Sequence, residues 1–186
     1  MTEPSDRDLM GRLAAGDRDA LAPLMERHYR RLYRIALAYL RRPDDALDVI
    51  QETFVKAYVH AARWDGAAEV APWLTRIAVN QAIDVYRRGR RRLCREEPLD
   101  DAAPQALAVG DASPERRVLG RELGERVDSA LRILPERQRA IFVLRHYEEL
   151  SLQEIAQALD MSLGTVKSSL HRAVARLRER LQGVRP

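Results

Sequence analysis

The chain has 186 residues and a formal net charge of +4, with 46% hydrophobic and 32% charged residues. This length suits one mid-sized domain or two small ones, and an aromatic content of 5% argues against an all-β fold. No apolar run approaches the roughly 18–20 residues of a membrane span, and the N-terminus lacks the basic and apolar regions of a signal peptide. The single cysteine, Cys94, cannot form an internal disulfide. We therefore expect a cytoplasmic protein without membrane insertion.

Helical periodicity dominates the first half of the chain, and no segment shows convincing strand alternation. A first helix is predicted after Asp17, which can act as its N-cap, and it ends before Pro43. A second helix begins there, and a third has Pro72 in its first turn, where the missing N–H of proline has no consequence. A loop from Trp64 to Glu69 separates these two helices. The expected apolar faces of the three helices are Leu21, Leu24, Met25, Leu32, Ile35, Ala36, Tyr39 and Leu40; Leu47, Ile50, Phe54, Ala57 and Tyr58; and Leu74, Ile77, Ala78, Ala82 and Val85.

The polar faces of the second and third predicted helices differ in charge. The second helix carries an acidic face: Asp44, Asp45, Asp48, Gln51 and Glu52. This face suits either a solvated helix with acids near its N-terminus or a docking surface for a basic protein, and periodicity does not choose between them. The third helix carries a stripe of aromatic, polar and basic residues: Trp73, Arg76, Asn80, Asp84, Arg87 and Arg91.

The stripe on the third helix is typical of nucleic-acid binding. Its arginines can neutralise phosphates, and its asparagine can hydrogen-bond a base edge or a sugar. Trp64 and Trp73 flank a loop of small residues and could stack on unstacked bases. The alternative, which composition favours, makes both tryptophans anchors of the core or the loop. In that alternative Asp84 is an ion-pair partner of Arg87 or Arg88.

Charge is segregated along the middle of the chain. Residues 87–95 contain six arginines, whereas residues 96–113 contain five acids, two prolines and no basic residue. Because the second segment has almost nothing to pack, we expect a flexible linker there. The predicted organisation is therefore a helical domain at 1–95, the linker at 96–113 and a second helical domain at 114–186. Clustered positive charge indicates a polyanionic partner.

The second predicted domain shows a helix-turn-helix pattern. Helices are predicted after Pro114 and Pro135, and a capping box of Ser151 and Glu154 opens a short helix. A turn at 161–163 then leads into a long basic helix. The apolar face of that helix is Val166, Leu170, Ala173, Leu177 and Leu181. The polar side chains suited to the major groove are Thr165, Lys167, Ser168, His171 and Arg172. A solvated amphipathic helix is the alternative, but the capped helix and turn before it favour DNA recognition.

No motif supports catalysis. The four histidines are scattered, without a pair at metal-ligand spacing on one face. Gly164 and Thr165 lack the remaining residues of a phosphate-binding loop, and Cys94 has no evident histidine partner nearby. We therefore expect no enzymatic activity, no metal and no cofactor.

Four sequence blocks, in this order and spacing, resemble the bacterial extracytoplasmic-function (ECF) sigma factors of the sigma-70 family: LDVIQETFVKAY, PWLTRIAVNQAIDVYRRGRR, LPERQRAIFVLRHYEELSLQEIAQAL and GTVKSSLHRAVARLRERL. The resemblance covers about residues 21–92 and 114–182. Four ordered blocks are a more specific signal than a lone helix-turn-helix. The resemblance implies an alternative sigma factor that binds core RNA polymerase and directs it to promoter DNA. It also implies an anti-sigma factor as a regulatory partner.

The resemblance further implies roles for individual residues. Contact with the clamp helices of the largest polymerase subunit is implied for Asp45, Asp48, Gln51 and Phe54. Binding of the melted −10 strand is implied for Trp73, Arg76, Asn80, Asp84, Arg87, Arg88 and Arg91. The loop between Trp64 and Pro72 would help to hold a flipped base. Recognition of the −35 element is implied for Thr165, Lys167, Ser168, His171 and Arg172.

Two positions depart from the family pattern, because Ser169 and Val174 stand where arginine is common. This predicts weaker phosphate contacts there, or an altered −35 preference. Two other functions stay open. A helix-turn-helix regulator that does not replace a sigma factor explains the second domain equally well, but it leaves the acidic helix and the tryptophan loop unused. A protein-interaction adaptor, whose basic helices bind acidic proteins, predicts binding without promoter sequence preference.

Overall fold

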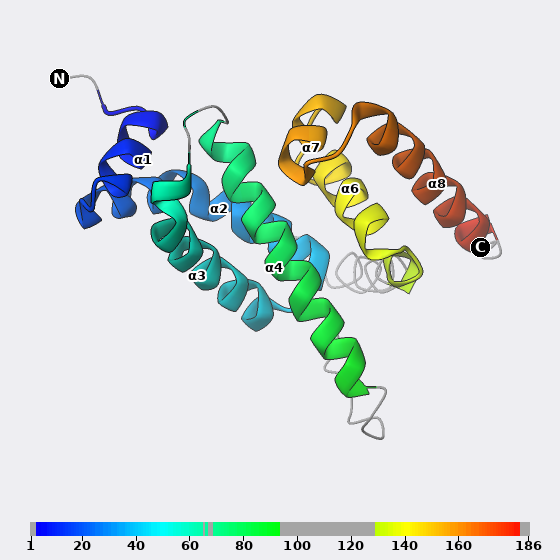
Figure 1. Cartoon of the computed structure of the whole chain (residues 1–186). Helices are drawn as coiled ribbons and strands as arrows, with labels where there is room; N and C mark the ends of the chain where they lie inside the picture. The colour runs from blue at the N-terminus through cyan, green and yellow to red at the C-terminus, as the bar shows by residue number, and fades with distance from the viewer. Residues whose placement is uncertain (1–2, 65, 67–68, 94–128, 183–186) are drawn as a thin grey trace, which may run out of the picture.

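The computed structural model describes residues 3–64, 66, 69–93 and 129–182, and every regular element in these ranges is a helix (Figure 1). The predicted all-α fold class is therefore confirmed. The predicted linker at 96–113 and most of the helix predicted after Pro114 lie outside the described residues, so the domain boundaries stay a prediction. Within the described ranges, no helix is long and apolar enough to cross a membrane.

The ends of the helices in the first part of the chain follow from local sequence. The elements are α1 (Asp6–Ala14), η1 (Arg18–Ala20), α2 (Leu21–Leu40), α3 (Pro43–His60), η2 (Ala61–Arg63) and α4 (Val70–Leu93). Asp17 caps the short 3₁₀ turn η1, which runs directly into α2. Arg41 ends α2 in the left-handed conformation, with φ of 62°, and Pro43 lies in the first turn of α3. The three helices expected in this part are thus confirmed.

Helix α1 is an addition to the helices expected from the sequence. A capping box opens it, because Asp8 N–H donates to Oγ of Ser5 at 3.2 Å and Ser5 N–H donates to Oδ2 of Asp8 at 3.0 Å. Asp6 ties α1 to α2: its carboxylate lies 2.9 Å from Nη1 of Arg27 and 2.6 Å from Nε2 of His28. The buried side chains of α1 are Leu9, Met10 and Leu13. Helix α1 therefore supports the core from the side of η2, α3 and α4.

Helices α2, α3 and α4 pack against one another and form the core of the first part. Most residues on the predicted apolar faces are buried, including Leu32, Ile50 and Leu74. Leu47 is an exception, because it is 39% exposed. The buried stripe of α3 begins at Ala46, which leaves the next residue on the outside of the helix. The prediction that Leu47 lies in the core is therefore wrong.

The second helical part contains the predicted helix-turn-helix. Its elements are α6 (Glu136–His146), α7 (Leu152–Leu159) and α8 (Leu163–Gln182). The predicted capping box is confirmed: Glu154 N–H donates to Oγ of Ser151 at 3.2 Å, and Ser151 N–H donates to Oε2 of Glu154 at 2.7 Å. Asp160 ends α7 in the left-handed conformation, with φ of 53°. Ser162 caps α8 by accepting a hydrogen bond from Thr165 N–H at 3.2 Å.

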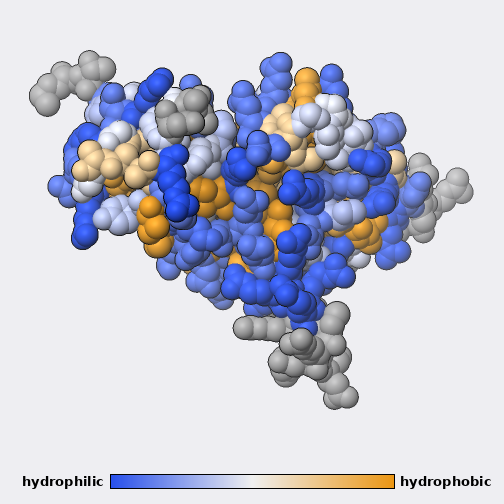
Figure 2. Space-filling view, viewed as in Figure 1, coloured by the Kyte–Doolittle hydropathy of each residue, from blue (hydrophilic) through white to orange (hydrophobic). Residues whose placement is uncertain are grey.

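The two helical parts pack against each other, with α6 on α2 and α7 on α4 (Figure 1). Their buried residues form one continuous apolar cluster, in which Ile141, Leu144 and Ile155 join the core of the first part. A second cluster within the second part includes Leu134 and Ala173. Outside these clusters the visible surface is mostly hydrophilic, with hydrophobic residues in small patches (Figure 2). Periodicity predicts each apolar face, but it does not tell what covers that face.

Candidate nucleic-acid interface

Helix α8 turns an apolar face toward its own domain and a polar face toward solvent. Val166 and Ala173 are fully buried, and Leu177 is nearly so, whereas the side chain of Leu181 lies outside the described residues. The side chains predicted to face the major groove are all exposed: Thr165, Lys167, Ser168, His171 and Arg172. The fold therefore brings these residues together on one open surface of the kind that enters a major groove.

Local hydrogen bonds orient part of the exposed face of α8. Oγ1 of Thr165 lies 2.7 Å from Oγ of Ser162, and the Ser168 hydroxyl donates to the backbone oxygen of Thr165 at 3.1 Å. Lys167 and His171 make no hydrogen bond or ion pair with other residues that the structure describes. Their polar atoms are therefore available to a ligand.

The two positions that depart from the family pattern lie away from this open face. Ser169 is 6% exposed, and Val174 is half-buried. The Ser169 hydroxyl accepts a hydrogen bond from Nη2 of Arg172 at 3.4 Å. Because position 169 is buried, the absence of an arginine there removes no cation from the exposed surface. The Ser169 side chain instead helps to orient Arg172.

The stripe predicted on α4 is divided between two surroundings. Two of its arginines, Arg76 and Arg87, face the second helical part, where each pairs with a carboxylate. Two other members, Asp84 and Arg91, line a groove between α3 and α4 together with the neighbouring Arg88. Asn80 is exposed. Helical periodicity predicts one continuous surface on α4. In the fold, one part of that surface contacts the second helical part and another part lines the groove with α3.

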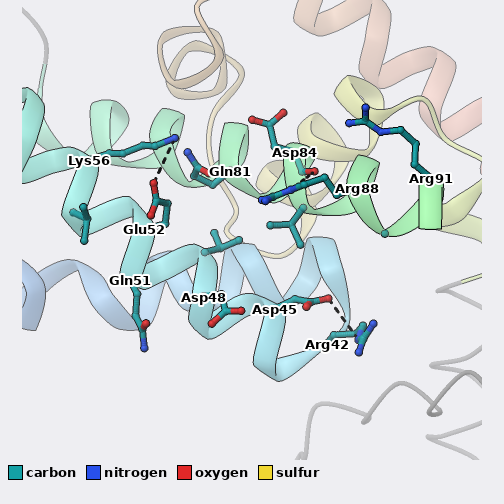
Figure 3. Close-up of a pocket in the computed structure, with 14 residues that line it drawn as sticks. Arg42, Asp45, Asp48, Gln51, Glu52, Lys56, Gln81, Asp84, Arg88 and Arg91 are labelled. Atoms are coloured by element: carbon teal, nitrogen blue, oxygen red, sulfur yellow. Dashed lines mark hydrogen bonds and ion pairs between the residues drawn. The ribbon is translucent and has the colours of Figure 1, made fainter. Parts of the chain in front are cut away.

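The groove between α3 and α4 has a volume of about 1070 Å³ and is lined by both signs of charge (Figure 3). Its charged side chains are Arg42, Asp45, Asp48, Glu52, Lys56, Asp84, Arg88 and Arg91. Two ion pairs lie along α3: Arg42 with Asp45 at 3.5 Å, and Lys56 with Glu52 at 3.8 Å. Solvent-exposed pairs of this kind contribute little to stability. They therefore leave these acids available to a partner.

Three of the four residues predicted for polymerase contact lie on the outside of α3. Asp48 and Gln51 are exposed, and Asp45 is half-buried. Phe54 is 3% exposed and belongs to the hydrophobic core, because it continues the buried stripe of α3. The expectation that Phe54 contacts polymerase is therefore corrected. The Phe54 side chain instead packs α3 against the hydrophobic core.

The tryptophans that flank the predicted loop are half-buried. Trp64 and Trp73 both pack against the core, as expected for anchors. Gly66, between them, has φ of 74°, in the left-handed region that favours glycine. Arg7 of α1 lies beside it, with Nη2 3.3 Å from where a Cβ of Gly66 would stand. Residues 65, 67 and 68 of this loop lie outside the described residues.

Carboxylates of the second helical part hold two arginines of the α4 stripe. Oε2 of Glu136 accepts a hydrogen bond from Nε of Arg87 at 2.7 Å, and this bond raises the pKa of Arg87 above its ordinary value. Oδ2 of Asp160 lies 2.9 Å from Nη2 of Arg76. The pair of Asp84 and Arg87 considered above is also present, but at 3.9 Å it is looser.

Sequence periodicity does not identify Arg139, which is only 2% exposed in α6. Its guanidinium carbon lies 4.8 Å from the ring centroid of Tyr39 and 4.6 Å from that of Tyr86. Arginine is rarely buried, so composition offers no signal for this site. The two residues that follow it, Ala140 and Ile141, are apolar and buried, and they indicate that this side of α6 faces inward. In the described ranges no group of three or more side chains is suited to hold a metal ion.

Comparison with known proteins identifies both helical parts. Residues 24–92 match the family Sigma-70 region 2, and residues 124–177 match Sigma-70, region 4. The ECF RNA polymerase sigma factor SigW of Bacillus subtilis is 31% identical over 171 residues, which cover 90% of this chain and 91% of that protein. SigM of Mycobacterium tuberculosis, also an ECF RNA polymerase sigma factor, is 36% identical over 175 residues, 94% of this chain and 84% of that protein.

A solved structure supports the same assignment. CnrH, in complex with the cytosolic domain of CnrY, has a TM-score of 0.69 and 27% sequence identity, and the match covers 97% of this chain and 99% of CnrH. Both helical parts thus correspond, in order, to regions of one class of protein, the sigma-70 factors. The chain belongs to the extracytoplasmic-function group of the sigma-70 family. Because its relatives along most of its length are sigma factors, a regulator that does not replace a sigma factor is not favoured.

Proposed function

We propose that this alternative sigma factor works through three surfaces. The acidic face of α3 docks on the clamp helices of the largest subunit of core RNA polymerase. The stripe of α4 binds the melted −10 strand, and α8 reads the −35 element in the major groove. The first two surfaces belong to the domain proposed at 1–95, and the third belongs to the domain proposed at 114–186.

The observation that carries the proposal is the opposite charge of two neighbouring helices in one domain. Asp48 on α3 is exposed and makes no ion pair with other described residues. Arg88 and Arg91 lie across the groove on α4. Acids repel DNA, so a protein that only binds DNA has no use for the α3 face. A protein that must hold both a basic protein surface and a nucleic-acid strand needs both faces side by side.

Binding of the −10 strand follows from the chemistry of α4. Its arginines can neutralise phosphates, and the exposed Asn80 can hydrogen-bond a base. Flipping a base out of the duplex costs a few kcal/mol. A pocket beside a cationic surface can offset that cost. The half-buried Trp64 and Trp73 anchor the loop that would form this pocket.

Recognition of the −35 element follows from the open face of α8. Lys167, His171 and Arg172 are exposed at the N-terminal half of the helix, which is the end that contacts bases in helix-turn-helix proteins. We propose that the two DNA contacts, each weak alone, reinforce each other once polymerase fixes their separation. The protein itself then performs no bond chemistry, and it acts in the cytoplasm under the control of an anti-sigma factor.

Reconstituted transcription tests this proposal. The purified chain is mixed with sigma-free core polymerase and a library of genomic promoter fragments, and the run-off transcripts are sequenced. We expect transcripts that start downstream of one shared pair of elements. Asp48→Arg should weaken binding to core polymerase by tenfold or more, on the order of a like-charge contact at an interface. Glu26→Arg, at an exposed position of α2, is the matched control and should bind normally.

Two results would count against the proposal. Sequence-specific retention of duplex DNA without any transcripts would favour an ordinary regulator. Equal polymerase binding by Asp48→Arg and Glu26→Arg would remove the α3 face from the docking surface.

A further inference from the structure

Helix α1 places a cation beside the loop that begins at Trp64. Arg7 is exposed on α1, and its Nη2 and Nε atoms lie 3.3 and 3.9 Å from the point where a Cβ of Gly66 would stand. Cη2 of Trp64 lies 3.9 Å from the same point. A guanidinium group, the edge of an indole ring and a glycine without a side chain therefore meet at one place.

Contacts with the core hold α1, and with it the backbone of Arg7, in this position. The three buried side chains of α1 belong to the hydrophobic core. Asp6, the residue before Arg7, pairs with Arg27 and His28 of α2. Helix α1 also contacts η2, which ends directly before Trp64. Because the backbone is anchored on both sides of the contact, a ligand bound there has little besides the Arg7 side chain to order.

The positive charge of Arg7 is not used within the fold. Arg7 makes no hydrogen bond or ion pair with other residues that the structure describes. The two acids next to it in sequence have partners of their own: Asp6 is paired as above, and Oδ2 of Asp8 accepts hydrogen bonds from the backbone N–H and the hydroxyl of Ser5 at 3.0 and 2.6 Å. Figure 1 shows α1 at the end of the first part that lies away from α6, α7 and α8. The Arg7 guanidinium is therefore available to a ligand.

The chemistry at this place suits a single strand of nucleic acid. An unstacked base needs an aromatic surface, and the phosphate beside it needs a cation. Gly66 has a φ of 74° and no side chain, which allows a ligand to approach the backbone closely. The same loop leads into α4, where the stripe proposed to bind the melted strand begins at Trp73. This continuity favours a nucleic-acid strand over an acidic peptide as the ligand.

We propose that α1 is part of the surface that binds the melted −10 strand, and that Arg7 binds a phosphate of this strand beside Trp64 and Gly66. Helix α1 precedes residues 24–92, which match Sigma-70 region 2, so this contact extends the surface beyond the matched residues. The identity of the strand as the −10 strand rests on the proposed function. The binding of single-stranded DNA at Arg7 does not.

The salt dependence of binding tests the phosphate contact. Fluorescence anisotropy measures the affinity of the full chain for a labelled single-stranded DNA of mixed sequence at several salt concentrations. Arg7→Gln should weaken binding several-fold and make the slope of log affinity against log salt concentration shallower by about 0.7, the value for one phosphate contact with a single strand. Arg7→Lys keeps the charge and should keep the slope. Arg30→Gln, at an exposed position of α2, has the same change in net charge and should change neither quantity.

A second measurement separates a phosphate contact from a structural role. Because Arg7 has no described hydrogen-bond or ion-pair partner, Arg7→Gln should leave the melting temperature unchanged. Weaker binding with an unchanged salt slope would show that Arg7 only supports the loop, and it would overturn the proposal. Equal affinity and slope for Arg7→Gln and Arg30→Gln would overturn it too, as would a wild-type chain that does not bind the single strand at the lowest salt concentration.

Run-off transcription with core polymerase distinguishes this proposal from the proposed function. If the slope changes as expected but the wild-type chain supports no transcription, the Arg7 contact stands and the proposed sigma function fails. If the wild-type chain supports transcription but Arg7→Gln binds the single strand with wild-type affinity and slope, the sigma function stands and the Arg7 contact fails.

Discussion

Helices α4 and α8 carry similar stripes of polar and basic side chains, but the two stripes have different neighbours in the fold. All the side chains predicted to contact DNA on α8 are exposed, whereas Arg76 and Arg87 of α4 are paired with carboxylates of the second part. The reason is position: α4 lies between α3 and α7, while α8 presents its polar face outward. A helix that reads duplex DNA needs an open face at all times. The Arg76 and Arg87 side chains keep 46% and 51% exposure, so their carboxylate partners contact these cations without burying them.

The largest difference between α4 and α8 is expected from two single alanine substitutions, one on each helix. In the free chain, Arg172→Ala should weaken binding to a duplex that carries the −35 element by about 1–3 kcal/mol, the range for losing a base or phosphate contact. Arg87→Ala should leave the same binding unchanged, because Arg87 lies on α4, on the surface proposed for the melted −10 strand, and its guanidinium pairs with Glu136. Fluorescence anisotropy with the duplex measures both. Equal losses for the two variants would show that α4 contacts the −35 duplex as much as α8 does.

A smaller effect is expected from the capping box that positions the helix-turn-helix. Ser151→Ala removes the side-chain acceptor for Glu154 N–H and should lower the free energy of unfolding by about 1 kcal/mol. Gln153→Ala, at an exposed position of the same helix, is the control. Chemical denaturation followed by circular dichroism measures both changes. An equal change in the free energy of unfolding for both substitutions would show that the Ser151 cap does not stabilise α7.

The smallest effect concerns helix α1, which packs against α2, α3 and α4, and it depends on pH. Burial alone would raise the pKa of Asp6, but hydrogen bonds from Arg27 and His28 outweigh burial and lower it below its ordinary value of 3.8. A carboxyl group with a lowered pKa in the folded state stabilises the fold above its unfolded pKa, and this stabilisation is lost as the pH falls through the folded value. Asp6→Asn should therefore lower the melting temperature at neutral pH, and the difference should shrink below about pH 4. A difference that stays constant down to pH 3 would contradict this assignment.

The helices with strong local signals could be predicted from the sequence. Pro43 and the pair Ser151–Glu154 mark helix starts through their own chemistry, and the structure confirms both. Asp17 caps the 3₁₀ turn η1 that leads into α2, and α2 itself has no side-chain cap. Helix α1 carried the same kind of signal, since Ser5 and Asp8 have capping-box spacing ahead of apolar residues at helical spacing. The local sequence of α1 therefore contains enough information to predict this helix.

The contacts between the two parts could not be predicted in this way. Arg87 and Glu136 are 49 residues apart, and no local pattern relates them. Arg139 is buried only because two tyrosines from other helices cover it. Periodicity predicts Leu47 and Phe54 on the same buried face of α3, but only Phe54 is buried, and the polymerase contact that the family resemblance implies for Phe54 is corrected. Which face of a helix is open depends on its neighbours, and those are set by tertiary packing.

Site-specific photocrosslinking in a promoter complex tests the central claim most directly. A photoreactive amino acid is placed at Asn80 of α4 or at His171 of α8, both exposed, and the chain is assembled with core polymerase on a promoter found by the transcription experiment. The account predicts that position 80 crosslinks to the unpaired strand near the start site. Position 171 should crosslink to paired DNA one or more helical turns upstream. Crosslinking of both positions to the same duplex segment would contradict the division of labour between α4 and α8.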